Sequence, residues 1–381
     1  MRNIYLLIFI AISISTAAQP YQVGRRSTFY TDAGRSRNIG TELYYPASSA
    51  GTNVPLAPGT TAFPVVVFGH GFTIPYGSYK WLGDSLASNG FIAVFPTTES
   101  SLSPSHEQFG RDLAFLCSRI TSLTDSAGSF LFGRIKNRAA VAGHSMGGGS
   151  SFLAANYNTA INAIFNFAAA ETTPSAKAAA FNVNIPALIF SGSSDCIVRD
   201  TNQLRMYSNV MYPCKAYVNI SNALHCHFAN NEASCVTGQF FSGCNSSPIT
   251  APIVFDKTVA LLLPWLQYYL QDSCSAKDVF EARLSGMAGI SWQRSCSNDP
   301  FICASPPIQY IFTGSGNWTD AANWQNNLIP PSPLPLGSEI IIAATGNNTC
   351  ILNTPQTIPT GAALTVQSGK ILLIQGNLMI Q

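Results

Sequence analysis

The segment that most constrains the fold of this chain is residues 139–155. It begins with a short apolar run, continues through Gly-His-Ser-Met-Gly-Gly-Gly at residues 143–149, and ends in small and apolar residues. This order predicts a buried strand, a sharp turn with Ser145 at its tip, and a helix that starts directly after the turn. Because the chain contains 29 glycines, so short a motif also occurs by chance, and its context has to decide what it means.

The context is an alternation of strand-like and helix-like segments. Residues 65–68, Val-Val-Val-Phe, form a continuous apolar run that is typical of a strand buried on both faces in a parallel sheet. The other expected elements are strands at 41–45, 91–95, 161–167, 187–191 and 216–220, and helices at 78–88, 105–123 and 253–270. They predict an α/β fold with a doubly wound, mostly parallel sheet and a site above the carboxyl ends of its strands.

The residue pattern of the sequence changes after about Cys303. Residues 305–307, Ser-Pro-Pro, are typical of a linker, and glycines separate the short β-like runs of the tail. These runs, at 340–342, 363–366, 371–374 and 378–380, predict a small all-β segment, either a β-solenoid or a small sandwich. We therefore expect a large α/β domain over residues 19–303 and a linker with a β-rich segment over residues 304–381.

Residues 1–18 have the pattern of an export signal. A basic start at Arg2 precedes an apolar core at 4–14 and small residues at 16–18. That core is too short to anchor the chain across a bilayer, so we expect a secreted or cell-surface protein without a transmembrane anchor. Charged residues make up only 10% of the chain and the formal net charge is +2, which argues against a nucleic-acid partner.

Ten cysteines in an exported chain favour disulfides over metal ligation. No Cys-x-x-Cys pair occurs, so we expect no metal site and no cofactor. Cys117 lies in a helical pattern and is equally compatible with a free buried thiol. The disulfide candidates are Cys196, Cys214, Cys226, Cys235, Cys244, Cys274 and Cys296.

A serine hydroxyl becomes a good nucleophile only when a histidine accepts its proton and a carboxylate orients that histidine. Ser145 has the context of a nucleophile elbow, which is followed along the chain by the acid and then by the histidine. Asp195 directly follows the strand at 187–191 and is the expected acid, whereas Glu171, Asp200 and Glu232 lack that placement.

Two histidines remain after Ser145, namely His225 and His227, in a loop after the strand at 216–220. We favour His225 as the base. His227 is then a residue of the substrate cleft or a structural residue.

The negative oxygen that forms during such a reaction needs two backbone N–H donors. Met146, directly after the nucleophile, is expected to supply one, and Phe72, in the loop after the strand at 65–68, the other. His70 precedes the serine and is expected to shape this loop. The His144 side chain is expected to be buried and to pack against its neighbours.

These residues resemble a known family. The sequences at residues 70–73 (His-Gly-Phe-Thr), 80–83 (Lys-Trp-Leu-Gly), 86–91 and 143–149 are similar to those of bacterial polyesterases and cutinases. That group includes the poly(ethylene terephthalate) hydrolases and lies among the dienelactone-hydrolase-like α/β-hydrolases. The resemblance covers about residues 41–296.

The resemblance implies a lidless serine esterase with an open cleft that Phe72, Met146, Ile197 and His227 line. The family places a cleft tryptophan in the loop after the strand that follows the elbow, but residues 168–173 here read Ala-Ala-Ala-Glu-Thr-Thr. An aromatic polyester would therefore lack that stacking partner. The family's disulfides would correspond to the pairs Cys196 with Cys214, Cys226 with Cys235 or Cys244, and Cys274 with Cys296.

The leading hypothesis is a secreted, monomeric serine ester hydrolase that acts through an acyl-enzyme on Ser145, with polymeric esters among its substrates. One alternative is an esterase for small soluble or lipid esters. Another is a surface adhesion protein with an inactive hydrolase domain. In that case Trp318 and Trp324 in the tail would form a flat adhesive face for a polymer or glycan, but we favour packing in a core or a cap for both.

Overall fold

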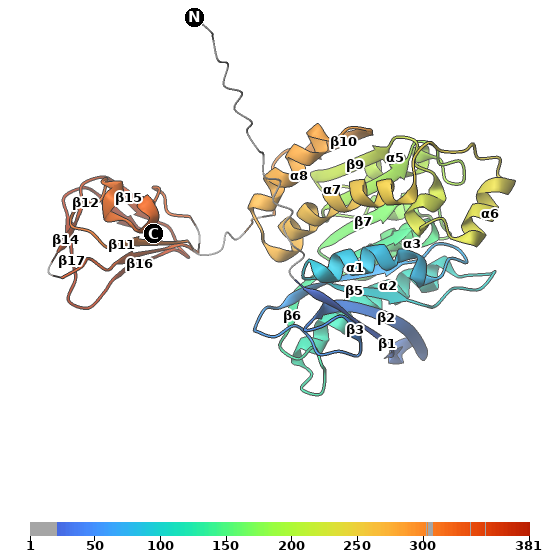
Figure 1. Cartoon of the computed structure of the whole chain (residues 1–381), viewed down its shortest axis with the longest axis horizontal. Helices are drawn as coiled ribbons and strands as arrows, with labels where there is room; N and C mark the ends of the chain where they lie inside the picture. Colours follow the sequence, from blue (N-terminus) through green and yellow to red (C-terminus); the bar gives the residue numbers. More distant parts are fainter. Residues whose placement is uncertain (1–20, 302, 304–307, 336, 347) are drawn as a thin grey trace, which may run out of the picture.

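The computed structural model of the protein describes residues 21–381 except 302, 304–307, 336 and 347, so the expected export signal at 1–18 lies outside the described residues. Its main part is a ten-stranded sheet with helices on both faces (Figure 1). The strands are β1 Gln22–Asp32, β2 Arg37–Ala47, β3 Gly51–Thr52, β4 Phe63–Gly69, β5 Ile92–Pro96, β6 Ile135–His144, β7 Ala163–Phe167, β8 Ala187–Gly192, β9 Cys214–Ile220 and β10 Ile290–Cys296. Their order across the sheet is β10-β9-β8-β7-β6-β4-β5-β2-β1-β3.

The middle of this sheet is parallel from β5 to β9, whereas β2 and β10 pair antiparallel with its two sides. In β4, Val65 and Val67 belong to one hydrophobic core, while Val66 and Phe68 belong to a second core on the opposite face. All four side chains are fully buried, which explains why the run is apolar at every position. The expected α/β fold with a mostly parallel sheet is confirmed.

Helices cover both faces of the sheet. The first core takes residues from α2 His106–Thr121, α3 Met146–Tyr157, α4 Ala176–Ala180 and α5 Asp200–Asn209, and the second from α1 Lys80–Ser88, α7 Ala251–Gln271 and α8 Ser275–Gly286. The short helix α6 Ala233–Phe241 buries only Cys235 and Gln239. Among the described residues, no helix combines the length and the apolar character needed to cross a membrane.

Several elements lack a clear signal in the sequence. β1 is only half-buried along its length because it pairs with β2 near the edge of the sheet, so it carries polar residues such as Arg25 and Arg26. α5 buries only three residues, and its sequence is mostly polar. α4, α6, α8 and β10 were likewise not expected. Short or exposed elements do not produce the periodic apolar pattern that long core elements show.

The C-terminal segment forms parallel β-structure with a hydrophobic core of its own. Its strands are β11 Gln309–Phe312, β12 Gly316–Asn317, β13 Glu339–Ile342, β14 Thr349–Leu352, β15 Gln356–Ile358, β16 Ala363–Val366, β17 Ile371–Ile374 and β18 Leu378–Ile380. β13, β14 and β15 pair in parallel with β16, β17 and β18 in the same order. Such coil-on-coil pairing is that of a β-solenoid and not of an antiparallel sandwich.

The two tryptophans of this segment are core residues. Trp318 is completely buried and Trp324 is 2% exposed. The indole Nε1 of Trp324 donates to the carbonyl of Trp318 at 2.7 Å, and the two rings lie 4.8 Å apart. The hypothesis of a flat adhesive tryptophan face is therefore wrong. The domain boundaries at residues 303 and 304 stay a prediction.

A buried ion pair supports the loops at the carboxyl edge of the sheet. The Asp112 side chain in α2 is fully buried and accepts from the Arg37 guanidinium at 2.8 and 2.9 Å and from the Thr98 hydroxyl at 2.6 Å. The carbonyl of Thr98 lies 2.8 Å from Nε2 of His70, in the loop after β4. The carboxylate therefore connects β2, α2 and this loop.

Replacement of Asp112 by alanine removes the buried carboxylate that pairs with Arg37 and Arg35, while Arg37 keeps Glu99 at 2.6 Å. We expect Asp112→Ala to lower the free energy of unfolding by about 3 kcal/mol, since one partner of a buried pair is lost. Urea titration followed by circular dichroism measures this change. Arg111→Ala removes an exposed ion pair with Glu107 on the same helix and is the matched control, for which we expect less than about 1 kcal/mol. Equal effects of the two substitutions would contradict a special role of Asp112.

Candidate active site

Ser145 lies in a strained turn between β6 and α3. Its φ and ψ angles are 53° and −117°, which is rare for a residue other than glycine. The turn is held by hydrogen bonds from Ser145 N to the carbonyl of Phe167 (3.0 Å) and from Ala170 N to the carbonyl of Ser145 (2.9 Å). Strain of this kind persists only where the surrounding structure over-determines it, and it is common at functional sites.

The glycines around Ser145 are needed because backbones approach each other closely. A Cβ atom on Gly147 would collide with the backbone of Gly69 and His70, and one on Gly143 would collide with Gly147 itself. Gly147 N donates to the carbonyl of His70 at 3.1 Å. The motif therefore docks the elbow against the loop that follows β4.

Asp195 and His225 are paired at the carboxyl ends of β8 and β9. Oδ2 of Asp195 lies 2.7 Å from Nδ1 of His225, and both residues are buried. The other carboxylate oxygen accepts from the N–H groups of Ile197 and Val198 at 2.9 and 2.8 Å. These bonds fix the carboxylate, so that it can orient the imidazole and leave the ring's second nitrogen for a proton from a nucleophile.

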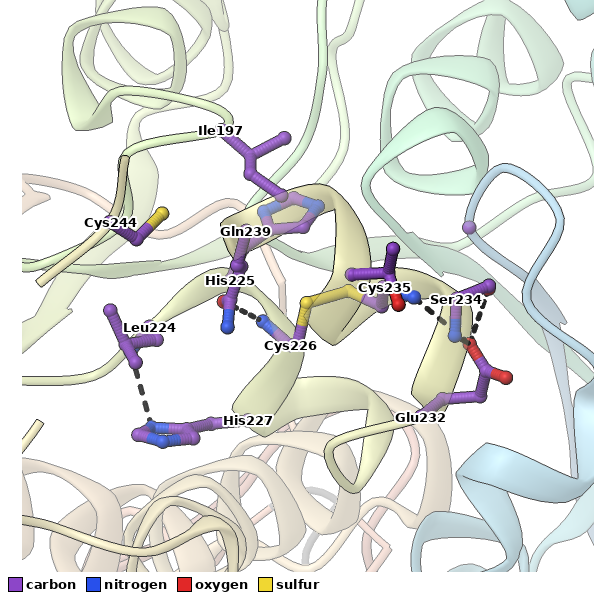
Figure 2. Close-up of a disulfide and its surroundings, with 12 residues drawn as sticks. Ile197, Leu224, His225, Cys226, His227, Glu232, Ser234, Cys235, Gln239 and Cys244 are labelled. Carbon is purple, nitrogen blue, oxygen red and sulfur yellow. Dashed lines mark hydrogen bonds between the residues drawn. A yellow bond between two sulfur atoms is a disulfide. The ribbon is translucent and has the colours of Figure 1, made fainter. Parts of the chain in front are cut away.

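His227 takes no part in this pair. It is 4% exposed, and its Nδ1 accepts from Leu224 N at 3.1 Å (Figure 2). Burial lowers its pKa, so the ring is held in its neutral form. The ring caps the short 3-10 helix His225–Ala229, which agrees with the structural alternative for His227, and its place in the substrate cleft stays a prediction.

The two expected oxyanion donors lie in the loops that Gly147 joins. Met146 is the first residue of α3, where a backbone N–H has no partner within the helix. Phe72 follows Gly71 in the loop after β4, and its side chain is 46% exposed. Met146, in contrast, is 3% exposed, and its place in the cleft stays a prediction.

His144 and Tyr79 connect the loop after β4 with the catalytic candidates. Tyr79 OH accepts from Gly71 N at 3.0 Å and lies 2.9 Å from Nδ1 of His144. Burial raises the pKa of Tyr79 far above its usual value, so its hydroxyl stays protonated and can donate to that nitrogen. Burial and the neighbouring His225 lower the pKa of His144 well below its usual value. The His144 ring lies 4.6 Å from the His225 ring and packs against it as a neutral group.

Residues 168–173 follow β7 and contact the turn at Ser145, where Ala170 N donates to the Ser145 carbonyl at 2.9 Å. Ala168 and Ala169 are fully buried, and no aromatic side chain occurs in this loop. Ile197, two residues beyond the acid, is an apolar residue that is 37% exposed.

The disulfides differ from most of the expected pairs. Cys226 is bonded to Cys235, one of its two expected partners (Figure 2). The pairs Cys196 with Cys214 and Cys274 with Cys296 are wrong. The structure contains Cys196–Cys244, Cys214–Cys296 and Cys274–Cys303 instead. Cys214 and Cys296 face each other in the register of β9 and β10, which the sequence could not reveal because β10 was not expected. Cys117 is a free buried thiol.

A family profile described as PET hydrolase-like matches residues 11–243, which is more than half of the chain. The protein belongs to the PET hydrolase-like family. The resemblance expected from the motifs is thereby confirmed, and with it the enzyme class of ester hydrolases.

Curated relatives of this PET hydrolase-like protein have modest identity. A cutinase of Thermobifida alba is 24% identical over 245 residues, covering 59% of this chain and 75% of the relative. A bis(hydroxyethyl) terephthalate hydrolase of Streptomyces coelicolor is 29% identical over 230 residues, covering 60% and 67%. A cutinase of Thermobifida fusca is 25% identical over 243 residues, covering 59% and 70%.

Tyr79 was missed in the sequence because nothing in its neighbourhood distinguishes it from a packing residue. We expect Tyr79→Phe to lower the free energy of unfolding by about 1–3 kcal/mol, since the buried N–H of Gly71 loses its acceptor. The loop after β4 then positions the expected donor, the N–H of Phe72, less precisely. We therefore expect kcat for a soluble ester to fall by a larger factor than KM changes. Denaturant titration and steady-state kinetics measure both effects.

Tyr76→Phe is the control, because Tyr76 lies on the same 3-10 helix (Tyr76–Tyr79) and is only half-buried. We expect its stability to stay within about 0.5 kcal/mol of the parent. If Tyr79→Phe behaves like this control, the hydroxyl does not support the loop.

Proposed function

We propose that the protein is an exported serine ester hydrolase with Ser145 as nucleophile, His225 as base and Asp195 as the orienting acid. The observation that carries this proposal is the 2.7 Å contact between Asp195 Oδ2 and His225 Nδ1, together with the strained turn at Ser145. Family membership supports the same assignment. Export is supported by the signal-like residues 1–18 and by the disulfides.

In the proposed reaction, Ser145 Oγ attacks the ester carbonyl while His225 Nε2 accepts its proton. The negative oxygen of the tetrahedral intermediate accepts from the N–H groups of Met146 and Phe72. The protonated His225 then donates its proton to the leaving alcohol, and the acyl group remains on Ser145. Water, deprotonated by His225, attacks the acyl-enzyme. The bond between the acyl carbon and Ser145 Oγ then breaks as His225 returns the proton to Ser145 Oγ, and the carboxylic acid product leaves.

The proposed substrates are apolar esters, with polyesters of the cutin and terephthalate type among them. The names of the relatives support this class, since they include cutinases and a bis(hydroxyethyl) terephthalate hydrolase. The exposed side chains of Phe72 and Ile197 beside the triad suit an apolar chain. The adhesion hypothesis has lost its main support, because Trp318 and Trp324 are core residues.

Two histidine variants separate the base from its neighbour. We expect His225→Asn to lower kcat for p-nitrophenyl butyrate by at least about 10³-fold, as Ser145→Ala should. His227→Asn is the matched control two residues away, and it should keep kcat within about threefold while losing stability, because it removes only a cap. Steady-state kinetics on the purified full chain measure these values. Full activity of His225→Asn, or a parent that hydrolyses no ester, would contradict the proposal.

A further inference from the structure

Helix α6 is covalently tied to both sides of the proposed triad. The disulfide Cys226–Cys235 joins its first turn to the residue after His225 (Figure 2). A second disulfide, Cys196–Cys244, joins the segment after its end to the residue after Asp195. A nine-residue helix with two buried residues has little packing to hold it in place. The two disulfides therefore determine where it lies relative to the acid and the base.

Hydrogen bonds hold α6 in the same place. Gln239 Oε1 accepts from Cys226 N at 2.8 Å (Figure 2). At the start of the helix, the Glu232 carboxylate accepts from Ser234 N and Cys235 N at 2.9 and 3.1 Å, which caps two unpaired donors. α6 is thus a rigid part of the site and not a loose surface helix.

One row of α6 faces the cleft residues. Ser234 Oγ lies 3.5 Å from Thr73 Oγ1, next to Phe72 on the oxyanion side. One turn later, a Cβ atom placed on Gly238 lies 3.9 Å from Cδ1 of Ile197, on the acid side. Residues three and four apart share a helix face, so Phe241 continues the row of Ser234 and Gly238.

Phe241 and its neighbour Phe240 are strongly exposed. Their side chains are 82% and 78% exposed, and their rings lie 5.7 Å apart in an edge-to-face arrangement. Two adjacent exposed phenylalanines on a rigid helix are typical of a binding surface. α6 contains no charged residue between Ala233 and Phe241, so the surface suits an uncharged, apolar occupant.

We propose that Phe240 and Phe241 form a docking surface for the part of an apolar ester chain that extends beyond the scissile bond. This inference rests on the proposed esterase function and names a binding site for its substrate. Phe241 continues the cleft from Ile197 outwards along α6, and Phe240 lies beside it on the neighbouring helix face, about 100° around the axis. The two phenylalanines supply aromatic contact area to the substrate from α6. The loop at 168–173 contains no aromatic residue and cannot supply it.

Chain-length selectivity tests the docking surface. The ratio of kcat/KM for p-nitrophenyl octanoate to that for p-nitrophenyl acetate is measured for the full chain and for the double variant Phe240→Ser/Phe241→Ser. We expect this ratio to fall about 10-fold in the variant, because the longer acyl chain loses apolar contact. The acetate rate should stay unchanged, since acetate does not reach α6.

Phe132→Ser is the matched control. Phe132 is 54% exposed but precedes β6, at the amino end of the parallel strands and thus at the edge of the sheet opposite to Ser145. For Phe132→Ser, the octanoate-to-acetate ratio of kcat/KM should equal that of the parent. An unchanged ratio in the double variant, an equal loss on both esters, or the same fall in Phe132→Ser would overturn the docking surface.

The failure of the proposed function has a different signature. A parent that hydrolyses neither ester would contradict the esterase itself, and the docking proposal with it. If the double variant keeps the parent's selectivity but changes a dimer into a monomer in sedimentation velocity, the surface binds a second copy of the chain, and the substrate proposal is wrong.

Discussion

The hydrogen bond from Gly147 N to the carbonyl of His70 joins the two loops on which the proposed chemistry depends. It forms because β4 and β6 are adjacent parallel strands whose carboxyl ends meet at the same edge. A side chain at position 147 would collide with the backbone of Gly69 and His70 and separate these loops. The N–H groups of Phe72 and Met146, which we propose as donors to the oxyanion, depend on this arrangement of the two loops. The glycine-rich motif is thus a requirement of backbone packing before it is a requirement of catalysis.

The catalytic candidates could be predicted because they follow long, buried strands. Ser145 and Asp195 follow strands that continuous apolar runs mark in the sequence, and His225 follows a strand, β9, that is mostly apolar but contains Lys215 and Asn219. The choice of His225 over His227 could not be derived from the strand pattern, since both lie in one loop. The structure separates them through their partners, a carboxylate for His225 and the N–H of Leu224 for His227.

The parts that escaped prediction are those that depend on contacts between distant segments. The disulfide Cys214–Cys296 depends on the pairing of β9 with β10, and β10 is mostly exposed and carries no apolar pattern. Helix α6 is short and buries two residues, so its sequence has no helical periodicity to detect. The tail was easier, because each coil of a solenoid repeats an apolar strand. The choice between a solenoid and a sandwich required the structure, because it depends on the parallel pairing of the strands.

The central claim is that Ser145 is the activated nucleophile of this chain. Covalent labelling with a fluorophosphonate, followed by intact-mass measurement and peptide mapping, tests it without assuming any natural substrate. The account predicts a single adduct on Ser145, and loss of labelling when His225 is replaced by asparagine. Absence of an adduct, or an adduct on another serine such as Ser150 or Ser151 of α3, would contradict it.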